Sequence, residues 1–180
     1  MKLNNKGFGT LGYVLIGCGV IVLIGILIIG IGGYSIFKLG DTALKETYAY
    51  AQEEDKVAQE LRDLPKNLQS KEDFVKSFTI QKNLRKKFEN IKVSETIKPI
   101  VSDCRKVRLE MYTAMETTAD QLLVMSENPT PDFDKMTQTL AEGQKKIEDI
   151  KKKGETVCAE YTATVKEATS YNEKLKEMNK

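Results

Sequence analysis

The chain has 180 residues, with 28 lysines and arginines against 26 aspartates and glutamates, and it contains no histidine and no tryptophan. The lack of histidine excludes Ser-His and Cys-His catalytic pairs and histidine metal ligands, and the cysteines form no CxxC pair for a zinc site. Because Lys2 and Lys6 are the only charged residues of the first 37, residues 38–180 are neutral overall, which is not typical of a nucleic-acid-binding domain. From these limits of composition and charge together we expect a non-enzyme without cofactor, metal, nucleic-acid partner or small-molecule substrate.

The first predicted element is an apolar segment without a charged residue between Gly7 and Phe37. It exceeds the ~20 helical residues that cross a bilayer core of ~30 Å. We therefore predict a short N-terminal segment at 1–10, a transmembrane signal anchor in contact with the bilayer at 11–37, and a helical domain at 38–180. Small residues spaced by multiples of seven form a stripe for close helix packing, or reflect the ordinary abundance of glycine in membrane helices. They are Gly12, Gly19 and Gly33 in one set and Cys18, Gly25 and Gly32 in the other.

Three other interpretations of this segment remain open. A cleaved secretory signal has a shorter apolar core and ends in a small-residue cleavage site. The sequence LIGC from Leu15 to Cys18 looks like a bacterial lipobox, but a second apolar stretch follows it instead of a polar tether. The sequence KGF from Lys6 to Phe8 resembles a type IV prepilin leader, although Gly12 stands where that family usually has glutamate.

Lysines lie on both sides of the segment, so the positive-inside rule leaves its orientation open.

Beyond the anchor, apolar residues recur at gaps of three and four, which predicts an all-α fold of four helices without strands. The first helix continues from the anchor and ends at Pro65, and Glu54 interrupts its apolar face. The second begins at SKED, where Ser70 can cap the helix and Asp73 can complete a capping box.

The third helix is expected from Thr96 to Glu127, and a fourth follows the turn at Pro129. Thr130 is the expected cap of the fourth helix, with Pro131 at its first position. The apolar gaps of the fourth helix predict one uninterrupted helix of roughly 65–70 Å, and such helices pack into an elongated antiparallel bundle or coiled-coil hairpin. The residues of the apolar face of each helix form its predicted seam. The seam of the third helix is Ile100, Cys104, Val107, Met111, Ala114, Thr118, Leu122 and Met125. The seam of the fourth helix is Phe133, Met136, Leu140, Gly143, Ile147, Ile150, Gly154, Val157, Tyr161, Val165, Ala168, Tyr171, Leu175 and Met178.

Cys104 and Cys158 lie on the two helices that flank the Pro129 turn. Facing residues of an antiparallel hairpin have a constant sum, and the midpoint of these two positions is 131, close to the turn. The cysteines are therefore expected to lie nearly level, within reach of a disulfide that would stabilise the fold by ~4 kcal/mol. Two unrelated reduced thiols at one level are the alternative. Because disulfides persist outside the reducing cytosol, the bridge predicts a periplasmic or extracellular helical domain.

The sequence LRDLPKNL from Leu61 to Leu68 resembles the signature of the LemA family, which is similar to Arg-Arg-x-Asp-Leu-Ile-Pro-Asn-Leu. One residue is missing before Pro65, and Lys66 is inserted after it. The resemblance implies a short N-terminal membrane helix followed by an extended antiparallel helical bundle, without implying a mechanism. The matching residues are Arg62, Asp63, Leu64, Pro65, Asn67 and Leu68, and PDF at 131–133 and YN at 171–172 are also similar to later family features.

These features together predict a single-pass membrane protein. We expect it to act as a non-catalytic scaffold, interaction or regulatory component of a cell-envelope complex, with a protein partner or by self-association. One alternative is a type IV pilin-like fibre subunit, whose mature N-terminus would be Phe8. The other is a ligand-sensing helical bundle, which would need a partner to relay its signal across the membrane.

Overall fold

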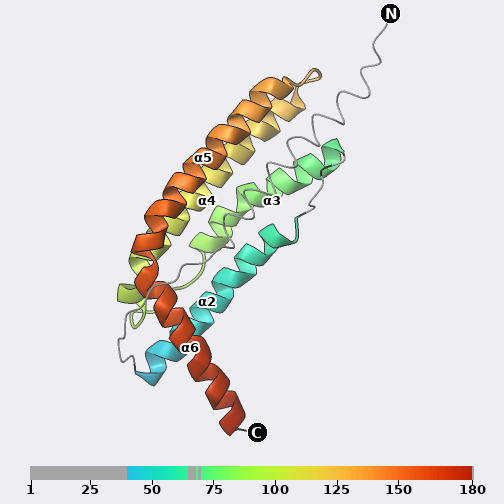
Figure 1. Cartoon of the computed structure of the whole chain (residues 1–180). Coiled ribbons are helices and arrows are strands. Elements are labelled where there is room, and N and C mark those ends of the chain that lie inside the picture. Colours follow the sequence, from blue (N-terminus) through green and yellow to red (C-terminus); the bar gives the residue numbers. More distant parts are fainter. Residues whose placement is uncertain (1–39, 65–67, 69, 180) are drawn as a thin grey trace, which may run out of the picture.

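The computed structural model describes residues 40–64, 68 and 70–179, and in this part of the chain the secondary structure is entirely helical (Figure 1). The helices are α2 (Asp41–Arg62), α3 (Lys71–Glu89), α4 (Lys98–Glu127), α5 (Phe133–Val157) and α6 (Ala159–Met178). The predicted all-α bundle is therefore confirmed for these residues. The predicted anchor at 11–37, with its small-residue stripe, lies outside the described residues. None of the five described helices is long and apolar enough to cross a membrane.

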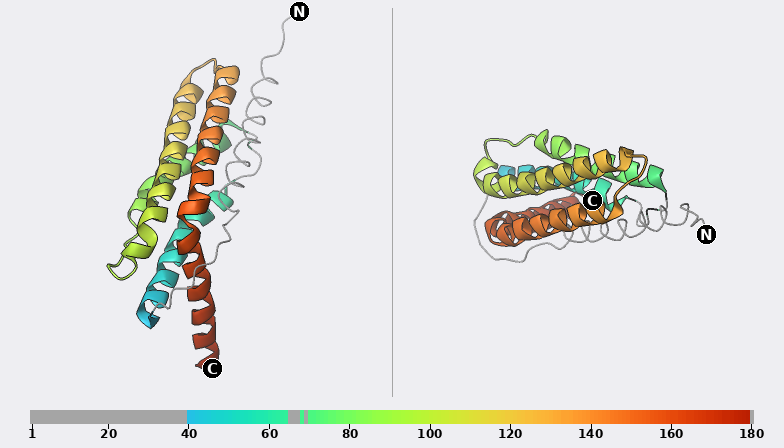
Figure 2. Two further views of the ribbon diagram at one scale, coloured as in Figure 1. Left: turned by 60° about the vertical axis from the view of Figure 1, so that its left-hand side comes forward. Right: turned by 90° about the horizontal axis from the view of Figure 1, so that it is seen from above.

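Helix α4 is central, because it contacts α3, α5 and α6. It forms an antiparallel hairpin with α5, while α2 packs against α3 and α6 (Figures 1 and 2). Since α4 is covered on more than one side, its buried surface is broader than the single predicted seam. Val101, Met115 and Ala119 are buried although they lie off that seam, whereas the seam residues Ile100 and Met125 are only partly buried.

Two apolar clusters fill the bundle. The larger one includes three leucines of the LemA-like stretch, Leu61, Leu64 and Leu68, which are at most 3% exposed. Burying each such side chain contributes roughly 1.5–3 kcal/mol. These leucines pack with side chains of α3, α4 and α5, among them Phe74, Phe78, Phe88, Met115, Leu122, Met136 and Ile147. The smaller cluster consists of Tyr50, Ile97, Val101, Cys104, Cys158 and Tyr161.

Local signals place most helix ends where the sequence predicts them. α2 ends at Arg62, before Pro65. The Ser70 hydroxyl accepts a hydrogen bond of 3.1 Å from the backbone N–H of Asp73, so the predicted cap of α3 is confirmed. Pro99 lies in the first turn of α4, where its missing N–H costs nothing.

The predicted cap at Thr130 is wrong. The Asn128 side chain accepts a hydrogen bond of 3.2 Å from the Thr130 N–H, so the chain still turns at this point. α5 begins at Phe133, and the Asp132 side chain caps it by accepting a 3.0 Å hydrogen bond from the Lys135 N–H. A carboxylate also interacts favourably with the positive end of the helix dipole, which a threonine hydroxyl does not.

The predicted uninterrupted fourth helix is also wrong. α5 ends at Val157, α6 begins at Ala159, and α6 bends away from α4 to pack along α2 (Figure 1). The break changes which side chain faces inward: Val157, a predicted seam residue, is 38% exposed, whereas Cys158 is 2% exposed. Cys158, one position after the predicted seam residue Val157, is the side chain that faces inward at the break, where it is bonded to Cys104.

Candidate functional site

The predicted disulfide between Cys104 and Cys158 is present in the structure, and it joins α4 to the break between α5 and α6. The Cα atoms of the two cysteines are 4.6 Å apart. Both residues are 2% exposed and belong to the smaller apolar cluster with Tyr50 and Tyr161. The bridge therefore fixes the point from which α6 departs.

A buried carboxylate lies beside this bridge. Glu54, in the middle of α2, is 6% exposed. It forms an ion pair with Arg108 of α4, and the Tyr161 hydroxyl of α6 donates a 2.5 Å hydrogen bond to its Oε2. An unpaired carboxylate in this position would cost several kcal/mol, because burial removes its hydration. The two partners offset that cost and connect three helices at one point.

The protonation states of the partners suit this arrangement. Burial, followed by the charge of Glu54, raises the pKa of Tyr161, so its phenol remains a hydrogen-bond donor. Burial lowers the pKa of Arg108, but the combined attraction to Glu54, Tyr161 and Tyr112 and the hydrogen bond to Glu54 outweigh burial, so the pKa is raised. The Arg108 guanidinium also lies 5.1 Å from the centre of the Tyr161 ring, a cation–π contact.

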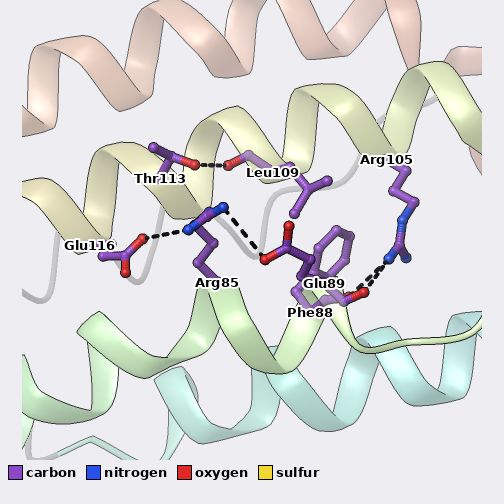
Figure 3. A network of polar contacts seen from close by, with 7 residues as sticks. All are labelled: Arg85, Phe88, Glu89, Arg105, Leu109, Thr113 and Glu116. Carbon is purple, nitrogen blue, oxygen red and sulfur yellow. Dashed lines mark hydrogen bonds and ion pairs between the residues drawn. The ribbon is translucent and has the colours of Figure 1, made fainter.

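Arg105, almost one turn before Arg108 on α4, connects this cluster to α3. Its Nη1 donates a 3.0 Å hydrogen bond to the Tyr50 hydroxyl, and its Nη2 donates to the carbonyls of Phe88 at 3.3 Å and Glu89 at 2.8 Å (Figure 3). These carbonyls belong to the end of α3, where a cation interacts favourably with the helix dipole. The Tyr50 ring meets the Tyr161 ring edge-on, with centroids 6.0 Å apart. The cluster of Tyr50, Glu54, Arg105, Arg108 and Tyr161 therefore joins α2, α3, α4 and α6.

Further ion pairs lie outside this cluster on the surface between α3 and α4. Arg85 reaches Glu116 at 3.4 Å and Glu89 at 3.5 Å (Figure 3). The Arg85 side chain is 38% exposed, so water screens these pairs and each contributes less than about 1 kcal/mol. The buried cluster therefore contributes more than this surface network to holding the helices together.

The sequence alone does not identify the cluster. Glu54 appears there only as an interruption of an apolar face, and its partners Arg108 and Tyr161 lie far along the chain. The usable signal is the position itself, because an acid at a core position of a helix requires a buried partner. The described residues contain no group of three or more acidic or cysteine side chains placed to hold a metal ion. No protein-family model matches the chain, and no curated protein or solved structure is significantly similar to it.

Proposed function

We propose that the chain is a single-pass membrane protein of the cell envelope, anchored through residues 11–37, whose helical domain is periplasmic or extracellular. In this proposal the domain works without catalysis, as a scaffold or regulatory component that binds a protein partner or a second copy of itself. The LemA-like architecture implied by Leu61 to Leu68 belongs to the same proposal.

The observation that carries the proposal is the Cys104–Cys158 disulfide. Disulfides persist in oxidising compartments and are rare in the cytosol. An apolar segment long enough to span a bilayer precedes this domain and supplies the anchor. A bridged domain attached to such a segment fits the outer side of the membrane.

The buried charge cluster supports the non-catalytic part. Arg108 and Tyr161 both bind the same Glu54 oxygen, so this carboxylate is engaged in holding helices together. The surrounding side chains exclude water from it, since Glu54 is 6% exposed. A cluster of this kind fixes the relative positions of long helices, which is what a spacer or docking platform needs.

The first experiment is disulfide mapping in the native host. Free thiols are alkylated in intact cells, and the full-length protein is then digested and analysed by mass spectrometry without reduction. We expect a peptide pair linked through Cys104 and Cys158, which disappears in a control sample reduced with a dithiol. Alkylation of both cysteines would overturn the proposed location.

The second experiment tests the mode of action. Photo-crosslinking amino acids at exposed positions of the helical domain, in cells at native expression, should give a discrete adduct with a partner or a second copy. Monomer alone at every position would overturn the scaffold proposal, as would substrate-dependent turnover by the purified protein. A mature N-terminus at Phe8 would overturn the signal anchor in favour of a pilin-like subunit.

A further inference from the structure

Helices α2 and α6 run antiparallel. Near the middle of α2, Tyr50 and Glu54 contact Tyr161 of α6. At the start of α2, the Asp41 carboxylate lies close to the Tyr171 hydroxyl of α6. Since α2 begins at Asp41, the residues of α6 from 172 to 178 continue beyond the end of their partner helix (Figure 1). At ~1.5 Å per residue this extension is roughly 10 Å long.

One face of this extension is apolar. Tyr171, Leu175 and Met178 are spaced by four and three residues, so they lie on the same side of α6. Met178 is 76% exposed, the most exposed large apolar side chain among the described residues. Lys174 and Lys176 lie on the solvent-exposed part of the same turns together with Glu173 and Glu177, so residues 172–178 carry no net charge. Tyrosine, apolar side chains and flanking lysines are the composition of helices that lie in a membrane interface.

The chain itself places a membrane near this extension. The uncharged apolar run ends at Phe37, four positions before Asp41. Even a fully extended chain spans at most ~3.6 Å per residue, so Phe37 lies within roughly 14 Å of Asp41. Asp41 in turn lies close to Tyr171, from which α6 extends by a comparable length. The end of the apolar run and the end of α6 are therefore within reach of one surface.

We propose that the end of α6, from Tyr171 to Met178, rests on the bilayer at the boundary between headgroups and acyl chains, next to the point where the anchor leaves the membrane. This inference rests on the proposed anchor at 11–37. The bundle then stands with the α4–α5 loop, which lies at the opposite end from the start of α2 in Figure 1, directed away from the membrane. The contact at the end of α6 and the anchor together hold the domain in one orientation.

The lack of tryptophan in the chain allows a direct test. Met178→Trp places a single reporter on the extension, and Val124→Trp places the matched control near the α4–α5 loop, where Val124 is 68% exposed. The full-length variants are reconstituted into vesicles of phosphatidylcholine and phosphatidylglycerol, with and without bromine on the upper acyl chains. Because bromine quenches tryptophan on contact, we expect Met178→Trp emission to shift to shorter wavelength and lose intensity with brominated lipid, while Val124→Trp emission does not change.

Vesicle flotation in alkaline carbonate separates the two proposals. Protein that floats while Met178→Trp remains unquenched would overturn the α6 contact and leave the anchor intact. Protein that fails to float would overturn the anchor itself. Quenching of both variants would overturn the upright orientation. A wavelength shift that depends on the protein-to-lipid ratio but not on bromine would assign the face to a second copy, against the inference.

Discussion

Tyr161 of α6 donates a hydrogen bond of 2.5 Å to the Glu54 carboxylate of α2, although 107 positions separate the two residues. On α6 the buried side chains are Tyr161, Thr164 and Ala168. With so few buried groups, this bond and the disulfide at Cys158 carry much of the attachment of α6 to the bundle. Removing either the Tyr161–Glu54 hydrogen bond or the disulfide should therefore also weaken the packing of α6 on the bundle, in addition to the direct loss of that one interaction.

Glu54→Gln should destabilise the bundle by about 2–3 kcal/mol. The amide keeps the shape of the side chain but removes the charge that compensates Arg108. The Arg108 side chain is 30% exposed, so the loss should lie below the range for breaking a fully buried ion pair. Denaturant unfolding of the full-length protein in detergent, followed by circular dichroism, measures the free energy of unfolding.

Two companion variants show whether burial is the cause. Glu53→Gln changes the neighbouring acid, whose side chain is 55% exposed in its pair with Lys56, and should alter the free energy of unfolding by less than about 0.5 kcal/mol. Glu54→Leu combined with Arg108→Met removes both charges, and should recover much of the stability lost by Glu54→Gln. A double variant less stable than Glu54→Gln would contradict this account.

The bundle is predictable from the sequence because its causes are local. Apolar gaps of three and four mark the helices, Ser70 and Pro99 mark two helix starts, and the positions of Cys104 and Cys158 around the turn predict the bridge. Competition between similar local signals is harder to judge. Thr130 and Asp132 can both cap a helix, and only the structure shows that the carboxylate does so.

The charge cluster and the bend in the last helix depend on partners distant in sequence. The regular spacing through Gly154, Val157 and Tyr161 predicts a straight helix with Val157 on its inner side, whereas the structure places Cys158 there. The same spacing cannot show that Glu54 has a cation and a phenol opposite it. These features follow from the relative placement of α2, α4 and α6, which no single segment specifies.

Gly143→Ala should destabilise the protein by about 1–2 kcal/mol. A Cβ at this position would lie 2.3 Å from Thr118 Oγ1 and 2.7 Å from Thr118 Cγ2, so α4 and α5 would have to move apart. The gain of roughly 1 kcal/mol from replacing a helical glycine offsets only part of this cost. The midpoint of thermal unfolding, measured for the full-length protein in detergent, should fall.

The matched controls for Gly143 use the same pair of helices. At Gly154 an added Cβ would meet Val107 Cγ1 at 3.1 Å, a milder contact, so Gly154→Ala should change stability less. Thr118→Ala removes the two atoms that lie closest to the added Cβ. This substitution should therefore reduce the stability of the Gly143→Ala variant less than it reduces the stability of the wild type. If the stability losses caused by Gly143→Ala and Thr118→Ala are additive in the double variant, the steric explanation fails.

Replacing both bridged cysteines, Cys104→Ala with Cys158→Ala, should lower the free energy of unfolding by about 2–4 kcal/mol. The bridge closes a long loop and limits the conformations of the unfolded chain, so its loss favours unfolding. The double variant still contains Cys18. A dithiol reductant should therefore destabilise the wild type and leave the double variant unchanged, and equal sensitivity of the two proteins would contradict a structural role for this bridge.

The bundle should lose stability in alkaline solution because it buries phenols. Burial raises the pKa of Tyr112 to about 12 and raises the pKa values of Tyr50 and Tyr161 as well. A raised pKa means that the folded state holds the proton more tightly than the unfolded state does. The contribution of each buried phenol to the free energy of unfolding is therefore complete below the ordinary tyrosine pKa of about 10 and is lost as pH rises through the folded pKa. The free energy of unfolding should then fall by up to about 1.4 kcal/mol per pH unit for each such phenol.

Tyr112→Phe isolates one of these phenols. The Tyr112 ring packs 4.9 Å from the Phe88 ring, and phenylalanine keeps that contact. The variant should therefore fold like the wild type at neutral pH and lose stability less steeply between about pH 10 and 12, because one fewer phenol ionises on unfolding. Denaturant midpoints measured across this range, together with the ultraviolet absorbance of the phenolate, test both points. Parallel pH curves for Tyr112→Phe and the wild type would show that Tyr112 does not contribute to the alkaline loss.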